Sequence, residues 1–174
     1  MNVLYAKCIL YSYSSLEAVM DQIDELVEKK ALASMSDTSP AYFQCEKIVL
    51  FTMQKDLLIE TKRTVDKILE RLTDYERECL DYKYFKSKPK TEYVGIDTTC
   101  RSYFRKQIKL AEIFADRLER AGIDDSRFEN VFLKIDFFRE LLRRVFEYEN
   151  VCIKNGQSFR KKKTQKVISI RKVG

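Results

Sequence analysis

Apolar residues recur at steps of three and four along much of the first 150 residues, the spacing of one helix face. The first such stripe spans residues 16–27 and predicts a helix that begins near Val3 or is interrupted or bent at Ser14 or Ser15. A serine-rich segment at 34–40 predicts a loop, with Ser39 as the cap and Pro40 as the first residue of the next helix.

The second helix is expected from about Ala41 to Arg71, where apolar residues recur every seven positions. They are Phe51, Leu58, Val65 and Leu72, with Ile48 and Leu69 in companion positions and Lys55 and Lys62 in the others. The seam is therefore partial, and the short preceding loop predicts an antiparallel helical hairpin. This hairpin is either a plain two-helix layer packed on later helices or an arm for dimerisation or partner binding.

A capping box marks the start of the next helix. Thr73 and Glu76 have the spacing at which each side chain satisfies a free backbone amide, and the helix should run to about Phe85. Pro89 suits the first turn of a short helix and would break a long one.

A turn bearing Gly95 then leads to a longer helix, from Thr98 to Ala121, with Asp97 as its cap and Gly122 as its end. Its apolar spacing predicts a buried face of Cys100, Phe104, Ile108, Ala111, Ala115 and Leu118. The same period predicts that its first two turns expose Arg101, Ser102, Arg105, Lys106 and Lys109.

An aromatic helix and a basic tail complete the chain. Asp124, Asp125 and Ser126 form a cap region, and a helix is expected from about Arg127 to Tyr148. It packs against the first two helices, against the preceding module, or in a homodimer. The tail at 151–174 is either a β-hairpin turning at its Asn-Gly pair or a basic arm that orders on DNA.

The expected fold is thus mainly α, with a long N-terminal antiparallel helical hairpin at 1–72 and a degenerate helix-turn-helix-like module at 73–122. A further apolar helix follows at 123–150, then the short basic tail at 151–174. A hydrophobic content of 45% with only four glycines and two prolines agrees with helices joined by short connections.

Composition narrows the function classes. The chain has no histidine, and its five cysteines are scattered singly, so we expect reduced thiols, no metal site and no cofactor. Without a phosphate-cradling glycine loop or a nucleophile beside a base, we expect no enzyme and no catalytic residue. The absence of an apolar run of membrane length and of a signal sequence predicts a cytoplasmic protein without a membrane contact.

Charge is segregated along the chain. The tail at 151–174 holds eight basic and no acidic residues, and residues 83–109 hold eight basic and two acidic ones. These segments carry +8 and +6 of an overall +6, so the rest of the chain carries −8. Two basic segments on an acidic scaffold favour phosphate contacts, because affinity depends on where the positive charge lies.

Four short segments between Leu72 and Leu118 carry a further pattern. They are Leu72-Thr73-x-Tyr75-Glu76-Arg77, Tyr82-Lys83-Tyr84-Phe85, Gly95-Ile96-Asp97 and Arg101-Ser102-Tyr103-Phe104-Arg105. Together they resemble the helix-turn-helix of sigma-factor region 4. They are more closely similar to the phage ArpU-like and RinA-like transcriptional regulators, which put such a module after long N-terminal helices.

The resemblance implies a DNA-binding transcriptional regulator of bacterial or phage type that binds double-stranded DNA, with helix Thr98 to Lys109 in the major groove. The expected base-facing residues are Thr98, Thr99, Arg101, Ser102 and Arg105. The expected phosphate contacts are Lys86, Lys88, Lys90, Lys106 and Lys109, with Arg160, Lys161, Lys162 and Lys163 in the tail.

A second hypothesis comes from the segment between Lys86 and Ile96, which is a few residues shorter than in that family. Thr91-Glu92-Tyr93-Val94 stands where the family has an acidic residue, Ile and Ala. The alternative is a non-enzymatic helical adaptor, or an RNA polymerase-interacting protein, with a vestigial helix-turn-helix.

Overall fold

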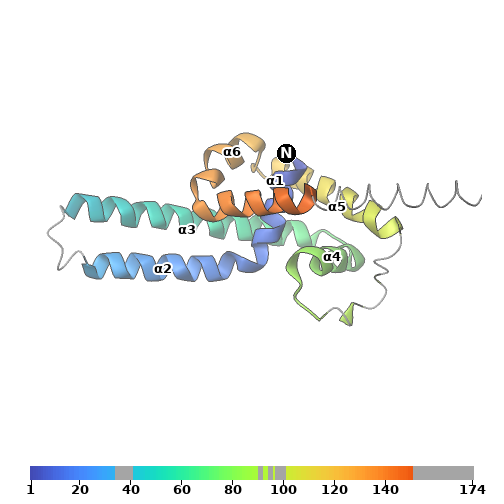
Figure 1. Ribbon diagram of the computed structural model, residues 1–174, viewed down its shortest axis with the longest axis horizontal. Helices are drawn as coiled ribbons and strands as arrows, with labels where there is room; N and C mark the ends of the chain where they lie inside the picture. Colours follow the sequence, from blue (N-terminus) through green and yellow to red (C-terminus); the bar gives the residue numbers. More distant parts are fainter. Residues whose placement is uncertain (34–40, 90–91, 94–95, 97–100, 151–174) are drawn as a thin grey trace, which may run out of the picture.

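The computed structural model describes residues 1–33, 41–89, 92–93, 96 and 101–150, and all regular structure in these ranges is helical (Figure 1). The elements are α1 (Val3–Ser12), α2 (Leu16–Ala33), α3 (Ala41–Glu70), α4 (Asp74–Leu80), α5 (Arg101–Arg120), α6 (Asp125–Asn130) and a helix at residues 136–150. The predicted mainly helical fold is confirmed for this part of the chain. The tail and its β-hairpin lie outside the described residues.

A bend separates α1 from α2 (Figure 1). α1 begins at Val3, and the 3₁₀ turn Tyr13–Ser15 interrupts the helix, so both features that the sequence offered as alternatives are present. The Tyr13 hydroxyl donates a hydrogen bond to Asp66 of α3 at 2.5 Å, and burial of the phenol raises the pKa of Tyr13. The bend lets α2 follow α3 while α1 turns away into the middle of the molecule.

α2 and α3 form the predicted antiparallel hairpin (Figure 1). Lys62 pairs with Glu17 at 3.2 Å and Lys55 with Asp24 at 2.6 Å, so residue numbers rise in one helix as they fall in the other. The two lysines that make the heptad seam partial thus reach acidic side chains on α2. Leu58, Val65 and Leu72 of the predicted seam are buried, and Phe51 is partly buried.

The predicted capping box is present at the start of α4. The Thr73 hydroxyl accepts a hydrogen bond from the Glu76 amide at 3.3 Å, and Glu76 accepts one from the Thr73 amide at 3.0 Å. That backbone hydrogen bond, more than any other cause, lowers the pKa of Glu76. A π-helical turn, Asp81–Phe85, extends α4 to the predicted end at Phe85.

Replacing Thr73 by alanine should lower the free energy of unfolding by about 1 kcal/mol, because one amide of α4 loses its acceptor. Urea denaturation followed by circular dichroism measures this change. Thr52→Ala is the matched control, since Thr52 is exposed within α3 and bonds only its own helix at the Ile48 carbonyl. An equal loss in both variants would contradict a capping role for Thr73.

α5 ends where predicted. Gly122 has a φ of 86°, a left-handed conformation that glycine adopts without strain. The Ile123 amide then donates to the Leu118 carbonyl at 2.9 Å, which satisfies one of the last acceptors of the helix. The chain reverses here and starts α6, where the Asp124 carboxylate accepts from the Arg127 amide at 2.7 Å.

The single helix predicted from Arg127 to Tyr148 is wrong. α6 stops at Asn130, a 3₁₀ turn spans Phe132–Lys134, and helix resumes at residue 136. The break collects three buried rings: Phe132 lies 5.4 Å from Phe128 and 5.0 Å from Phe138, between ring centres. In a continuous α-helix each residue advances by about 100° about the axis, so Phe138 would point about 100° away from the side that Phe128 and Phe132 share.

α1 lies at the centre of the core. Tyr5 stacks on Phe128 with 4.5 Å between ring centres, Cys8 lies against the Phe138 carbonyl, and Lys7 pairs with Glu149 at 2.6 Å. The helix at residues 136–150 therefore packs against α1, one of the positions that the sequence left open. Burial raises the pKa of the Cys8 thiol to about 12, as expected for a structural cysteine.

Candidate nucleic-acid interface

The first half of α5 presents the predicted basic residues to the outside. Arg101, Ser102, Arg105, Lys106 and Lys109 are all exposed. Residues 101–109 contain four basic and no acidic side chains, whereas Glu112, Asp116 and Glu119 follow in the second half. Positive charge is thus concentrated at the N-terminal end of α5. The helix dipole is also positive at this end, so side chains and helix both attract anions there.

The predicted buried face of α5 is wrong in this half. Phe104 and Ile108 are 58% and 59% exposed, although Ala111, Ala115 and Leu118 are buried as expected. Cys100 lies outside the described residues. The face that packs inward is rotated by about one residue and consists of Tyr103, Gln107, Leu110, Phe114 and Leu118, together with the two alanines.

Gln107 explains why the sequence pattern misleads. Its position interrupts the apolar stripe that starts at Tyr103, so the neighbouring stripe through Phe104 and Ile108 looks more continuous. The side chain is nevertheless buried, because its amide nitrogen donates to the Cys79 carbonyl of α4 at 2.5 Å. Burial also raises the pKa of Tyr103 to about 12. The exposed face therefore mixes basic side chains with Phe104 and Ile108.

α4 supports this half of α5. The Lys106 ammonium lies 4.1 Å from the centre of the Tyr75 ring, within the range of a cation–π contact. With the hydrogen bond between Gln107 and Cys79, this contact holds α5 against α4 at two successive positions. Lys106 is thereby oriented along the side of α5 that faces α4.

The Lys86–Lys88 loop is anchored by Asp81. This carboxylate accepts hydrogen bonds from the Ser87 amide at 3.0 Å and from the Tyr93 hydroxyl at 2.8 Å. Lys86 has a φ of 54°, and its amide donates to the Asp81 carbonyl at 2.7 Å, which ends the π-helical turn. Both lysines are exposed, so the anchored loop carries them on the surface.

Tyrosine rings connect this loop to α5. The Tyr82 ring lies 5.2 Å from Tyr93 and 6.1 Å from Tyr103, each nearly perpendicular to it. The two parts of the basic segment at 83–109 are therefore linked through packed rings, although about a dozen residues separate them along the chain. Lys90, Thr98 and Thr99, which were predicted to join the interface, lie outside the described residues, as do Arg160, Lys161, Lys162 and Lys163.

Arg144 is a basic residue that the sequence does not assign to this region. It comes from the helix at residues 136–150 and borders the same hollow as Lys86 and Phe104. Nothing in its local sequence indicates this position, because the approach depends on how that helix packs on α1.

Other chemistry is sparse in the part of the chain that the structure describes. No three side chains of the metal-binding types gather there. Of the described cysteines, Cys8 and Cys79 are buried and Cys45 is exposed, all as free thiols. None of the described helices combines the length and the apolar character that crossing a bilayer requires.

Comparison with known proteins returned no match from protein-family models, curated proteins or solved structures. The resemblance to sigma-factor region 4 and to the phage regulators stays a prediction.

Proposed function

We propose that this chain is a cytoplasmic DNA-binding transcriptional regulator of bacterial or phage type, with α5 as its recognition helix. The observation that carries the proposal is the connection between the exposed basic half of α5 and the Lys86–Lys88 loop through Tyr93, Tyr82 and Tyr103. α5 can thus approach the major groove while the Lys86–Lys88 loop, held in a fixed position beside it, contacts a phosphate.

The side chains divide between the two tasks. Arg101 and Arg105 read base edges, because an arginine fork meets two acceptors of guanine, and Ser102 assists. Lys106, Lys109 and the loop lysines neutralise phosphates, which positions the module without reading sequence. The sequence predicts further contacts by Thr98, Thr99, Lys90, Arg160, Lys161, Lys162 and Lys163, which lie outside the described residues.

Binding of a labelled random duplex by fluorescence anisotropy over a salt series tests the proposal. The logarithm of the affinity should fall with the logarithm of salt concentration by about 0.9 per phosphate contact. The full chain is compared with a variant in which Lys161, Lys162 and Lys163 are glutamine. A steep slope that survives in the variant supports phosphate contacts by the helical body, whereas loss of all binding restricts them to the tail and contradicts the proposed interface.

The exposed Phe104 and Ile108 favour the second candidate, a helical adaptor or RNA polymerase-interacting protein with a vestigial helix-turn-helix. These two apolar side chains are surrounded by basic ones, so they suit a protein partner whose surface is apolar at its centre and acidic around it. Purified bacterial RNA polymerase is the test partner, with Ile108→Glu as the variant and Val131→Glu as the exposed control. Polymerase binding that only Ile108→Glu abolishes, without duplex binding by the chain, would favour the adaptor.

A homodimer through the hairpin arm belongs to the DNA-binding proposal. Five apolar side chains on the distal part of α3 are more than half exposed: Tyr42, Phe43, Val49, Leu50 and Met53. Phe43 and Leu50 lie in line with Leu57, Thr61 and Ile68, at steps of seven, seven, four and seven. The latter three are buried, so an apolar face that the core covers near the body continues along the arm uncovered.

A second copy of this chain fits that face. Residues 24–33 and 41–56 hold four basic and five acidic side chains, a net charge of −1, so two arms can approach without strong repulsion. At roughly 100 Å² per exposed apolar side chain, the five provide about 500 Å² per protomer, a large part of the ~800 Å² that each partner buries in a standard interface. A dimer also matches the paired half-sites that helix-turn-helix proteins often bind.

Met53→Asp should convert the dimer to a monomer, because each protomer would bury a carboxylate against an apolar face. Sedimentation equilibrium on the full chain measures the mass. Thr52→Asp adds the same charge at the neighbouring exposed position of α3 and should leave the dimer intact. A wild-type chain that is monomeric at high micromolar concentration would contradict the arm as a dimer interface.

A further inference from the structure

A hollow of about 530 Å³ opens beside the candidate interface, between α1, the π-helical turn, α5 and the helix at residues 136–150. Its volume lies in the range of small-molecule sites. The hollow adjoins the candidate interface, because Lys86 and Phe104 belong to both. Three features of its lining point to one class of ligand.

The first feature is aromatic. Tyr11, Tyr82, Tyr103, Phe104 and Tyr148 line the hollow, so four elements contribute rings to one space. Tyr82 stands nearly perpendicular to Tyr103, with 6.1 Å between ring centres, and Tyr11 is steeply inclined to Tyr148 at 6.4 Å. The faces of aromatic rings stack on flat heteroaromatic groups, and such stacking accepts any nucleobase because every base has a π-face.

The second feature is positive charge at the rim. Lys83, Lys86 and Arg144 line the hollow together with the rings. Lys83 is only partly exposed and lies 3.9 Å from Glu149, whereas Lys86 and Arg144 are exposed and can meet an anion from solvent.

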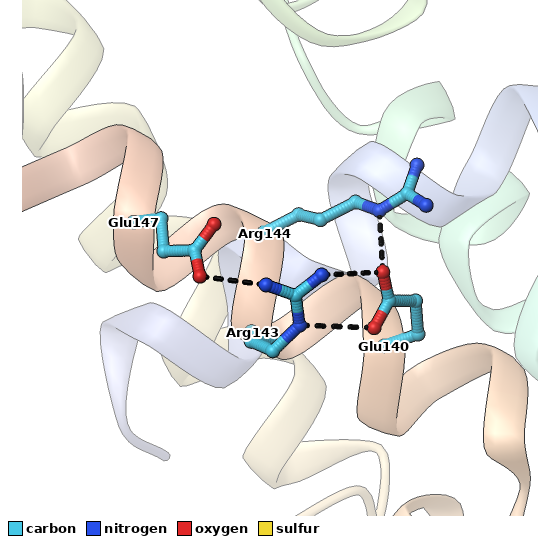
Figure 2. Close-up of polar contacts among 4 residues, drawn as sticks. All are labelled: Glu140, Arg143, Arg144 and Glu147. Atoms are coloured by element: carbon cyan, nitrogen blue, oxygen red, sulfur yellow. Dashed lines mark hydrogen bonds and ion pairs between the residues drawn. The ribbon is translucent and has the colours of Figure 1, made fainter.

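Arg144 is oriented by its own helix (Figure 2). Its Nε donates to Glu140 at 2.8 Å, and the terminal nitrogens point away from the carboxylates in the view. The preceding residue, Arg143, instead donates hydrogen bonds to both Glu140 and Glu147. Hydrogen bonds from Arg143 and Arg144 lower the pKa of Glu140 to about 2, so this carboxylate stays charged at neutral pH.

The third feature is an unpaired acceptor. Gln107 lines the hollow and is 3% exposed. Its Nε2 donates to the Cys79 carbonyl, which decides the orientation of the amide, and its Oε1 has no hydrogen-bond partner among the described residues. Buried acceptors are normally paired, and this one needs an N–H or O–H donor.

We propose that this hollow binds a nucleotide, with the base against the tyrosine rings, an N–H of the base donating to Gln107 Oε1, and the phosphate at Lys86 and Arg144. One ligand then supplies the flat ring, the donor and the negative charge that the three features require. The proposal does not rest on duplex binding by α5. The nucleotide is either free in solution or an unpaired unit of a single strand, which has the same base and phosphate.

Isothermal titration calorimetry on the full chain tests the site, with AMP, GMP, CMP and UMP as free nucleotides and a short single-stranded oligonucleotide as the strand. Inorganic phosphate and adenosine are titrated separately. We expect a nucleotide to bind more tightly than either part alone, since the rings and the cations act on one molecule. Binding of an oligonucleotide but of no mononucleotide would identify the strand as the source.

Two variants locate the binding. Arg144→Glu should weaken it at least tenfold, and Arg143→Glu is the matched control, because it changes the same network on the same helix but does not line the hollow. Tyr148→Leu removes one ring and should weaken binding by roughly tenfold to a hundredfold. Tyr148 is largely exposed, so the fold should tolerate this change.

Three results would overturn the proposal: no binding of any nucleotide or oligonucleotide at millimolar concentration, binding of inorganic phosphate as tight as that of nucleotides, or equal losses in Arg143→Glu and Arg144→Glu. Duplex binding measured in parallel keeps the two proposals apart. Arg144→Glu can abolish nucleotide binding while the duplex still binds through α5.

Discussion

Replacing Phe128 by alanine is expected to lower the free energy of unfolding by about 3–5 kcal/mol. The side chain is fully buried between Tyr5 of α1, whose ring stacks on it at 4.5 Å, and the rings of Phe132 and Phe138. Its loss leaves a cavity where the first and last described helices meet. Because domains of this size are stable by only about 5–15 kcal/mol, the variant should lie close to unfolding at 37 °C.

Urea denaturation followed by circular dichroism measures the effect. Phe146→Ala is the matched control, since Phe146 lies on the helix at residues 136–150 with more than half of its surface exposed. We expect that variant to lose less than about 0.5 kcal/mol, as is usual for surface substitutions. Equal losses in both variants would show that the aromatic cluster is not a main source of stability.

The second large effect is expected on DNA affinity. Arg105→Glu should weaken duplex binding by at least tenfold, because a base or phosphate contact is replaced by a repelling carboxylate within the basic half of α5. Arg120→Glu is the matched control. Arg120 is an exposed arginine of the same helix, but it lies in the acidic half and pairs with Asp116 at 2.9 Å.

Fluorescence anisotropy at one fixed salt concentration compares the two variants. Equal affinities would remove α5 from the DNA interface, and the adaptor would become the better proposal. Sequence preference is the finer measure: alanine at Arg101 or Arg105 should relax it at one base position, at a cost of roughly 1–3 kcal/mol. If both alanine variants keep the wild-type preference, neither arginine reads bases.

Helix ends were predictable where neighbouring residues determine them. The capping box at Thr73 and the left-handed position of Gly122 involve atoms a few residues apart, so the local sequence contains all that they need. The interruption at Tyr13–Ser15 is of the same kind. The hairpin followed from the heptad pattern of α3 and the short connection before it.

Tertiary packing decided the rest. The rotation of α5 depends on the carbonyl of Cys79, which gives a polar Gln107 a buried partner that no periodicity can indicate. The break between α6 and the last helix depends on three rings that meet only in the folded chain. The presence of Arg144 and Lys86 in the lining of one hollow likewise needs the packing of the last helix on α1.

The central position of α1 has a consequence for synthesis on the ribosome. Tyr5 and Cys8 are made more than 100 residues before their partners Phe128 and Phe138. At a synthesis rate of roughly 5–20 residues per second, α1 exists for at least several seconds before the residues that cover it are made. The hairpin of α2 and α3 can form early, because its contacts are local in sequence. The packing of α1 against α6 and the last helix comes late, and contacts between residues so far apart in sequence form slowly.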